Sequence, residues 1–280
     1  MNRTQLRSLL ESLQVRPSRA LGQNFLVDAN MLSAMLRDTR PRPGEHILEI
    51  GPGTGILTDR LLEAGCCVTT VELDRRLAAY LADKYAGNAR ITIHQGDACK
   101  LDCGLLMHEQ AYRCVANLPY AVSTILIAHL IGSCNPPGEF LILLQREMAD
   151  RLHASTHSKD YGAVSVQVQS FYEVKVLRLL PPEVFFPPPL VQSAFVRMKR
   201  LSNPIVPRER VHDLAALVRT AFSQRRKMVG KTLARRYGAG ITAQALDAAH
   251  VPPSFRPEQI TPPEYARILS ALRPDGAEGQ

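Results

Sequence analysis

Four consecutive residues, Asn117-Leu118-Pro119-Tyr120, combine an amide, a proline and an aromatic ring. The exocyclic amino nitrogen of adenine is a poor nucleophile because its lone pair is delocalised into the ring. The Asn117 side-chain oxygen and the Leu118 carbonyl, held by the rigid Pro119, could accept its two hydrogens and localise that pair. Tyr120 could stack on the base. The tetrapeptide therefore favours catalysis at an adenine amino group, achieved mainly by alignment and without a strong general base.

Asn and Pro are also common in ordinary turns, so this interpretation depends on a neighbouring cofactor site. A glycine-rich turn, Gly51-Pro52-Gly53-Thr54-Gly55, follows the apolar stretch 47–50. Glycines allow a ligand to approach the backbone closely, and a following helix would offer free N–H groups. The spacing differs from the dinucleotide fingerprint, and no lysine follows as in a phosphate-binding loop. The turn predicts a cofactor without a pyrophosphate.

Two acids support that cofactor, and a third, Glu49, precedes the glycines. Glu72 ends an apolar stretch, where a carboxylate can hold both hydroxyls of a ribose. Asp97, within Gly96-Asp97-Ala98, could accept from an adenine amino group. Either acid alone could be an ordinary acid at a strand end. Together with the glycines they favour S-adenosylmethionine over NAD.

A proline-stiffened segment, 184–189, carries Phe185 and Phe186. One of the two rings could clamp a flipped base on the face opposite Tyr120. The alternative is that both rings pack in the core beneath a loop.

The elements that would position these residues alternate between strand and helix from about residue 43 to residue 200. The expected strands are 46–50, 67–71, 91–94, 113–116, 140–144, 174–179 and 194–200. Expected helices begin near 57 and 123, and another extends through 81. This alternation predicts an α/β fold with a Rossmann-like, doubly wound parallel sheet, to which the last two strands could add a hairpin.

The character of the chain changes after residue 200. A linker with Pro204 and Pro207 is expected at 201–208, followed by helices at 211–222, 227–237 and 241–250. The predicted organisation is a methyltransferase domain, 1–200, with an N-terminal basic arm, 1–25, and a small C-terminal all-helical domain, 201–280. The last seven residues, 274–280, are expected to fray.

Positive charge is concentrated in two segments of a chain with a formal net charge of +8. The arm carries Arg3, Arg7, Arg16 and Arg19. Residues 221–237 contain six cations and no acid. Such a segment suits contacts with RNA phosphates, although it could be a solvated helix face. The predicted RNA-binding residues are Arg225, Arg226, Lys227, Lys231 and Arg235.

Other features of the sequence narrow the class of protein. No apolar run approaches the roughly 20 residues that a membrane span needs, and the N-terminus lacks a secretory signal pattern. Six cysteines form no CxxC pair, so reduced thiols in a cytoplasmic protein and no metal site are expected.

The chain resembles the ribosomal RNA adenine dimethyltransferases, specifically the KsgA/RsmA type that acts on the small subunit. Besides the motifs above, matching stretches occur in the family's order at 21–26, 71–74, 158–162, 185–189 and 222–227. The loop before Tyr161 departs from the pattern, with His157-Ser158-Lys159 where relatives often have Pro-Gly-Ser-Lys.

The resemblance implies dimethylation of N6 on two adjacent adenosines near the 3′ end of small-subunit (16S) rRNA, with S-adenosylmethionine as the methyl donor. We expect a monomeric enzyme that acts on RNA within a partly assembled small subunit. The resemblance favours Phe185 as the base clamp, so the expected catalytic residues are Asn117, Leu118, Pro119, Tyr120 and Phe185. The expected cofactor-binding residues are Asn24, Leu26, Gly51, Gly53, Gly55, Glu72, Leu73, Asp97, Ala98 and Asn117.

Three alternatives share parts of this pattern. A large-subunit rRNA methylase of the macrolide-resistance type would have the same tetrapeptide and glycine turn. An adenine-N6 DNA methyltransferase would need a separate target-recognition domain. A non-catalytic RNA- or DNA-binding factor on the same fold would not need the acceptor and cofactor residues that are present here.

Overall fold

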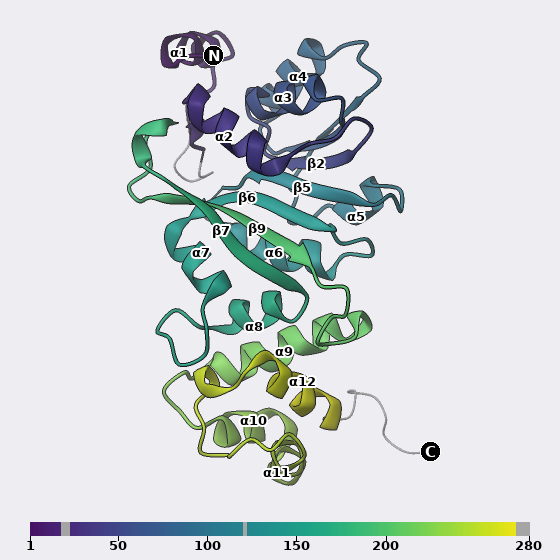
Figure 1. Cartoon of the computed structure of the whole chain (residues 1–280), viewed down its shortest axis with the longest axis vertical. Helices are drawn as coiled ribbons and strands as arrows, with labels where there is room; N and C mark the ends of the chain where they lie inside the picture. The colour runs from purple at the N-terminus through teal and green to yellow at the C-terminus, as the bar shows by residue number, and fades with distance from the viewer. Residues whose placement is uncertain (18–22, 120–121, 273–280) are drawn as a thin grey trace. The chain divides into compact units, whose positions relative to one another are not determined.

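The computed structural model describes residues 1–17, 23–119 and 122–272 (Figure 1). The chain forms two compact units. The first comprises residues 1–149 and 175–199, and the second comprises 150–174 and 200–280. Within the described residues, no helix is both long enough and apolar enough to span a bilayer.

The first unit is built on a seven-stranded sheet with the order β4-β3-β2-β5-β6-β9-β7. Its strands are β2 (His46–Ile50), β3 (Cys67–Glu72), β4 (Ile91–Gln95), β5 (Tyr112–Asn117), β6 (Glu139–Gln145), β7 (Tyr172–Leu180) and β9 (Ser193–Arg200). Neighbouring strands from β4 through β6 are parallel, whereas β9 is antiparallel to β6. The predicted doubly wound parallel sheet is confirmed, and β7 and β9 are hydrogen-bonded neighbours as expected.

The central strands form because their apolar residues can be buried on both sheet faces. In β6, every residue from Phe140 to Leu144 is fully buried, and Ile47 and Leu48 of β2 are equally inaccessible. Such uninterrupted apolar runs are typical of parallel strands covered on both sides, and they locate the strands within a residue or two of the predicted bounds.

The helices of the first unit connect or flank these strands. They are α1 (Arg3–Ser12), α2 (Ala29–Thr39), α3 (Ile56–Glu63), α4 (Arg75–Lys84), α5 (Cys103–Leu106), α6 (Ser123–Gly132) and α7 (Arg146–His153), whose last residues belong to the second unit. Figure 1 shows α3 and α4 beside the β2 half of the sheet and α6 and α7 along the other half. The winding reverses between β2 and β5, so the carboxyl ends of these two strands border the crevice where ligands bind in such sheets.

The N-terminal arm is folded onto the first unit by apolar contacts. Leu6 and Leu10 of α1 cluster with Val15, Phe25 and Leu77. Phe25 belongs to β1 (Phe25–Leu26), which pairs antiparallel with β8 (Phe185–Phe186) in a separate two-stranded sheet. Neither α1 nor this small sheet was predicted, because both depend on partners far away in the sequence.

The second unit consists mainly of helices. These are α8 (Ala163–Gln169), α9 (Val211–Phe222), α10 (Val229–Tyr237), α11 (Ala239–Ala248) and α12 (Pro262–Ala271), and the described residues from 201 to 272 contain no strand. The unit also takes in 150–174, which the sequence prediction placed in the methyltransferase domain, because α8 packs against α9 and α12.

The start of α10 differs from the predicted helix, which began at Lys227. Residues 223–227 form a turn, in which the Lys227 N–H donates to the Gln224 carbonyl at 2.8 Å. The Val229 N–H donates to the Phe255 carbonyl at 2.7 Å, so a tertiary contact fixes the first residue of α10. Arg225, Arg226 and Lys227 therefore precede the helix and lie in the turn.

Candidate active site

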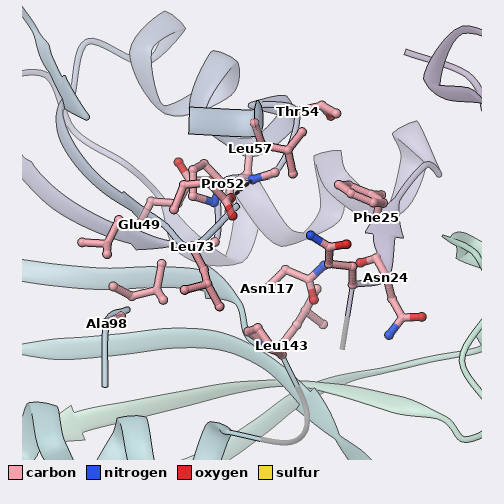
Figure 2. A pocket seen from close by; sticks show the side chains of 18 of the residues that line it. Asn24, Phe25, Glu49, Pro52, Thr54, Leu57, Leu73, Ala98, Asn117 and Leu143 are labelled. Atoms are coloured by element: carbon pink, nitrogen blue, oxygen red, sulfur yellow. Dashed lines mark hydrogen bonds between the residues drawn. The ribbon is translucent and has the colours of Figure 1, made fainter. Parts of the chain in front are cut away.

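A cavity opens at the carboxyl ends of β2 and β5, and all the residues that line it belong to the first unit (Figure 2). About 1120 Å³ of space, including open solvent at the mouth, lies between the residues that line it. Of the predicted cofactor residues, all except Gly55 line this cavity. They are Asn24, Leu26, Gly51, Gly53, Glu72, Leu73, Asp97, Ala98 and Asn117.

The glycine turn after β2 has a left-handed backbone at Gly51, Gly53 and Gly55, with φ of 67°, 61° and 80°. Gly55 does not line the cavity, because its carbonyl accepts from the Tyr85 hydroxyl at 3.1 Å behind the turn. The adjacent Thr54 carbonyl accepts from the Lys84 ammonium at 3.2 Å. The end of α4 thus holds the back of the turn, and its front is left to face the cavity.

Glu72 lies at the end of β3 with only 5% of its surface exposed. Its carboxylate accepts the Gly53 N–H at 3.0 Å on one oxygen and the Asp74 N–H at 2.9 Å on the other. Desolvation raises its pKa, although these hydrogen bonds lower it. Each oxygen retains acceptor capacity, so the carboxylate can accept further hydrogen bonds from hydroxyl groups.

Glu49 lies beneath the glycine turn and is 2% exposed. Its carboxyl accepts from the Thr58 hydroxyl at 2.6 Å. Desolvation raises its pKa to about 8. Glu49 lines the same cavity, where a cationic ligand would favour its charged form.

Asp97, Ala98 and Leu73 line the part of the cavity nearest β3 and β4. The Asp97 carboxylate orients the loop after β4 by accepting the Cys99 N–H at 3.0 Å. Leu73 is 48% exposed, which leaves an apolar side chain at the cavity wall. Figure 2 shows Leu73 and Ala98 on one side of the cavity and Asn24 and Phe25 on the other. An apolar wall next to a carboxylate suits a flat base with an amino group.

Asn117, the last residue of β5, lines the same cavity. Its amide nitrogen donates to the Asn24 carbonyl at 2.7 Å, which directs its side-chain oxygen away from that carbonyl. The Leu118 N–H donates to the Leu143 carbonyl at 3.2 Å, and Pro119 lines the cavity. Tyr120 lies outside the described residues.

Phe185 is fully buried in a core cluster with Leu26, Phe195 and other apolar side chains. Its ring exposes no face to a base in this arrangement, which matches the core-packing alternative. Phe186 is half-buried, and the Arg7 guanidinium lies 5.6 Å from its ring centroid. The base-clamp role of Phe185 therefore stays a prediction that requires the ring to leave its present packing.

The predicted RNA-binding residues differ in accessibility. Arg226, Lys227, Lys231 and Arg235 are exposed. Arg225 is half-buried, and its guanidinium donates to the Ser158 carbonyl at 3.1 Å. RNA binding by all five stays a prediction, and Arg225 already has a protein partner.

Several apolar residues of the cavity were not predicted, among them Phe25, Ile56 and Leu57. Phe25 stands between two predicted cofactor residues, so its position could have drawn attention. An apolar side chain, however, carries no chemical signal that distinguishes a cavity wall from a core.

Comparison with known proteins identifies relatives along nearly the whole chain. The family model described as ribosomal RNA adenine dimethylase matches residues 15–272. A Ribosomal RNA small subunit methyltransferase A from Pseudomonas aeruginosa is 38% identical over 263 residues, covering 94% of this chain and 97% of the relative. A protein of the same description from Streptococcus mutans is 34% identical, covering 97% of both chains.

Two solved structures are similar in fold. A dimethyladenosine transferase from Plasmodium falciparum has a TM-score of 0.70 at 22% identity, covering 87% of this chain and 95% of its own. The 23S rRNA methyltransferase ErmE has a TM-score of 0.64 at 24% identity, covering 89% of this chain and 99% of its own. Both likenesses support the Rossmann-like methyltransferase fold.

Proposed function

This chain belongs to the ribosomal RNA adenine dimethylase family, and from that membership we propose that it dimethylates N6 of two adjacent adenosines near the 3′ end of small-subunit rRNA. It is an enzyme that uses S-adenosylmethionine as methyl donor. The observation that carries the proposal is that Glu72, Asp97 and Asn117 line the same cavity, although they come from the ends of three different strands or the loops that follow them.

The residues of this cavity fit S-adenosylmethionine. Glu72 is buried, anchored by two backbone N–H groups and still able to accept from a ribose. The glycine turn leaves backbone exposed where a side chain would otherwise fill the space. When bound, S-adenosylmethionine supplies a methyl group that is electrophilic because it is carried by a sulfonium.

The way in which the target amino group is held follows from the orientation of Asn117. Because the amide nitrogen is engaged by the Asn24 carbonyl, the side-chain oxygen accepts one hydrogen of the target amino group. The Leu118 carbonyl accepts the other, and the two acceptors localise the nitrogen lone pair for in-line attack. The methylated nitrogen then loses a proton to solvent, so no buried base is required.

The small-subunit target is favoured over the large-subunit alternative by the curated relatives. They are described as small-subunit methyltransferases and match 90–97% of the chain at 34–39% identity. ErmE, whose description names 23S rRNA, is similar at a level that supports the fold alone. The intact acceptor and cofactor residues also favour catalysis over a binding factor.

The setting of the reaction is part of the same proposal. The substrate is a partly assembled small subunit, in which target adenosines are accessible, and the enzyme acts as a monomer. We propose that it acts in the cytoplasm, because bacterial ribosomes are assembled there and the curated relatives named above are bacterial. Arg226, Lys227, Lys231 and Arg235 contact RNA phosphates.

The test is methyl transfer from labelled S-adenosylmethionine to three substrates: unmethylated small subunits, naked small-subunit rRNA and naked large-subunit rRNA. We expect label in two adjacent adenosines of the small-subunit RNA and faster transfer to the subunit than to naked RNA. Label in the large-subunit RNA alone would establish the macrolide-resistance type, and no transfer to any of the three would reject the enzyme assignment.

A further inference from the structure

The basic turn between α9 and α10 contains three cations in very different surroundings. Arg226 and Lys227 are exposed, whereas Arg225 is half-buried. Arg225 donates from one terminal nitrogen to the Ser158 carbonyl at 3.1 Å, and its Nε lies 3.9 Å from a Glu258 carboxylate oxygen. One guanidinium thus joins the turn to two segments, at residues 155–160 and around 258.

The segment 155–160 has no helix or strand of its own and depends on these contacts. The His157 N–H donates to the Glu258 carbonyl at 3.0 Å, and His157 has a left-handed backbone with φ of 67°. The Ser158 carbonyl also accepts from the Tyr161 N–H at 3.4 Å. The loop is therefore held through Ser158 and Glu258, the two residues that Arg225 contacts.

A buried aromatic cluster anchors the end of this loop. Tyr161 is fully buried, and its hydroxyl donates to the Ile260 carbonyl at 2.9 Å. The rings of Tyr161 and Phe222 lie 6.2 Å apart, and those of Phe222 and Tyr265 lie 6.3 Å apart. Phe222 ends α9 and directly precedes the basic turn. The cluster therefore attaches both the loop and the turn to helices α9 and α12.

The charge of Glu258 makes the Arg225 contact costly to lose. The Glu258 side chain is 19% exposed, and one of its carboxylate oxygens is buried without a hydrogen-bond partner among the described residues. Removing the cation that lies near that oxygen would leave a poorly solvated carboxylate beside the loop. A lysine would keep a charge but cannot offer Nε and a terminal nitrogen in a fixed fork.

We propose that Arg225 is a positioning residue rather than a phosphate contact, and that the loop it holds, 155–160, brings Lys159 into the RNA-binding surface with Arg226 and Lys227. Lys159 follows Ser158 directly and is exposed. Arg226 follows Arg225 directly, so the Arg225–Ser158 hydrogen bond brings together the two stretches of backbone that carry these exposed cations. Asp160 is the adjacent acid and is half-buried. The inference rests on the proposed rRNA substrate.

The test compares charge-conserving exchanges in the full-length protein. Affinity for a small-subunit rRNA fragment that includes the 3′ end is measured over a series of salt concentrations. Arg226→Lys should keep affinity within about twofold, because a phosphate accepts either cation as a charge. Arg225→Lys should weaken binding about threefold to tenfold and speed amide hydrogen exchange at 155–162.

Lys159→Ala supplies a surface variant that should fold normally. It should weaken RNA binding about threefold to tenfold and lower the magnitude of the salt slope by about 0.7 to 0.9, one phosphate contact, at unchanged Tm. Lys199→Ala, which removes an exposed cation of β9, is the charge-matched control and should leave the slope unchanged.

Equal behaviour of Arg225→Lys and Arg226→Lys, with unchanged hydrogen exchange, would overturn the positioning role. An unchanged slope in Lys159→Ala would overturn the enlarged surface. Methyl transfer to RNA by the wild-type protein is measured in parallel. If it occurs while either of these results is found, this inference has failed and the proposed function has not.

Discussion

Asn117 depends on a backbone group for its orientation, since its amide nitrogen donates to the Asn24 carbonyl at 2.7 Å. Asn24 precedes β1, so a segment predicted to touch the cofactor also sets the direction of the acceptor oxygen. The sequence motif identified Asn117 as an acceptor, but the partner that orients it lies 93 residues away and left no signal in the motif.

Replacement of Asn117 by Ala should lower kcat on the order of 100-fold, because one acceptor for the amino hydrogens is lost. The Kd of S-adenosylmethionine should change by no more than a few fold. Single-turnover methylation and calorimetry measure the two effects separately. Asn117→Asp is the informative companion, because it sets a carboxylate oxygen against the Asn24 carbonyl and should also be strongly impaired. Near-normal turnover of Asn117→Ala would refute the acceptor role.

Glu49 gives the ligand-free protein a pH-dependent stability. Its pKa is raised from 4.5 to about 8 by desolvation, so the folded state holds a proton that the unfolded state has lost across that interval. The stabilisation is complete below about pH 4.5 and is lost as pH rises through about 8, by at most about 5 kcal/mol.

Glu49→Gln should therefore flatten the decline in the free energy of unfolding between pH 5 and pH 8.5, since Gln keeps an acceptor for Thr58 without titrating. Denaturant titrations at several pH values, with wild type as the reference, measure this. Superimposable profiles for the two proteins would show that Glu49 is not the responsible group.

At the scale of elements, strand positions were predicted well because parallel strands buried on both faces are continuous apolar runs. Helices α2 and α12 were not predicted, and α1 was expected only as an arm, since their helical character depends on burying one face against distant partners. The segment 150–174 joins the helical unit because Tyr161 packs against residues some hundred positions away, a contact that no local pattern reveals.

The glycine turn is held from behind by α4, and this predicts different outcomes for two glycines with similar backbones. Gly55 has φ of 80°, and an added Cβ would crowd Leu81 at 3.0 Å as well as the Tyr85 hydroxyl. Gly55→Ala should cost about 2 kcal/mol or more of stability and weaken S-adenosylmethionine binding about tenfold or more, because it displaces the turn.

Gly87 is the matched control for that variant. It has φ of 79°, but an added Cβ would meet nothing within 4 Å. Gly87→Ala should cost about 1 kcal/mol from the backbone alone and leave cofactor affinity unchanged. Thermal unfolding and calorimetry compare the two, and equal cofactor affinities would contradict the clamping role of α4.

Across the whole molecule, the sequence predicted the cofactor side of the site better than the RNA side. Glycines and acids at strand ends are tied to their positions by the sheet, and nearly all the predicted ones line the same cavity. Charge in the basic turn is visible in the sequence, but the partners of each cation are not, so Arg225 could not be distinguished from Arg226. The role of Phe185 was ambiguous for a similar reason, because an aromatic ring can pack in a core as readily as it can stack on a base.

The central claim, that this enzyme dimethylates adjacent adenosines in small-subunit rRNA, is tested most directly in cells that lack it. Mass spectrometry of small-subunit rRNA fragments should show two adjacent unmethylated adenosines near the 3′ end. Both should become N6-dimethyladenosine on complementation with the wild-type chain, and most copies should remain unmethylated with Asn117→Ala expressed at the same level. Full dimethylation in cells lacking the protein, or restoration by Asn117→Ala, would contradict the account.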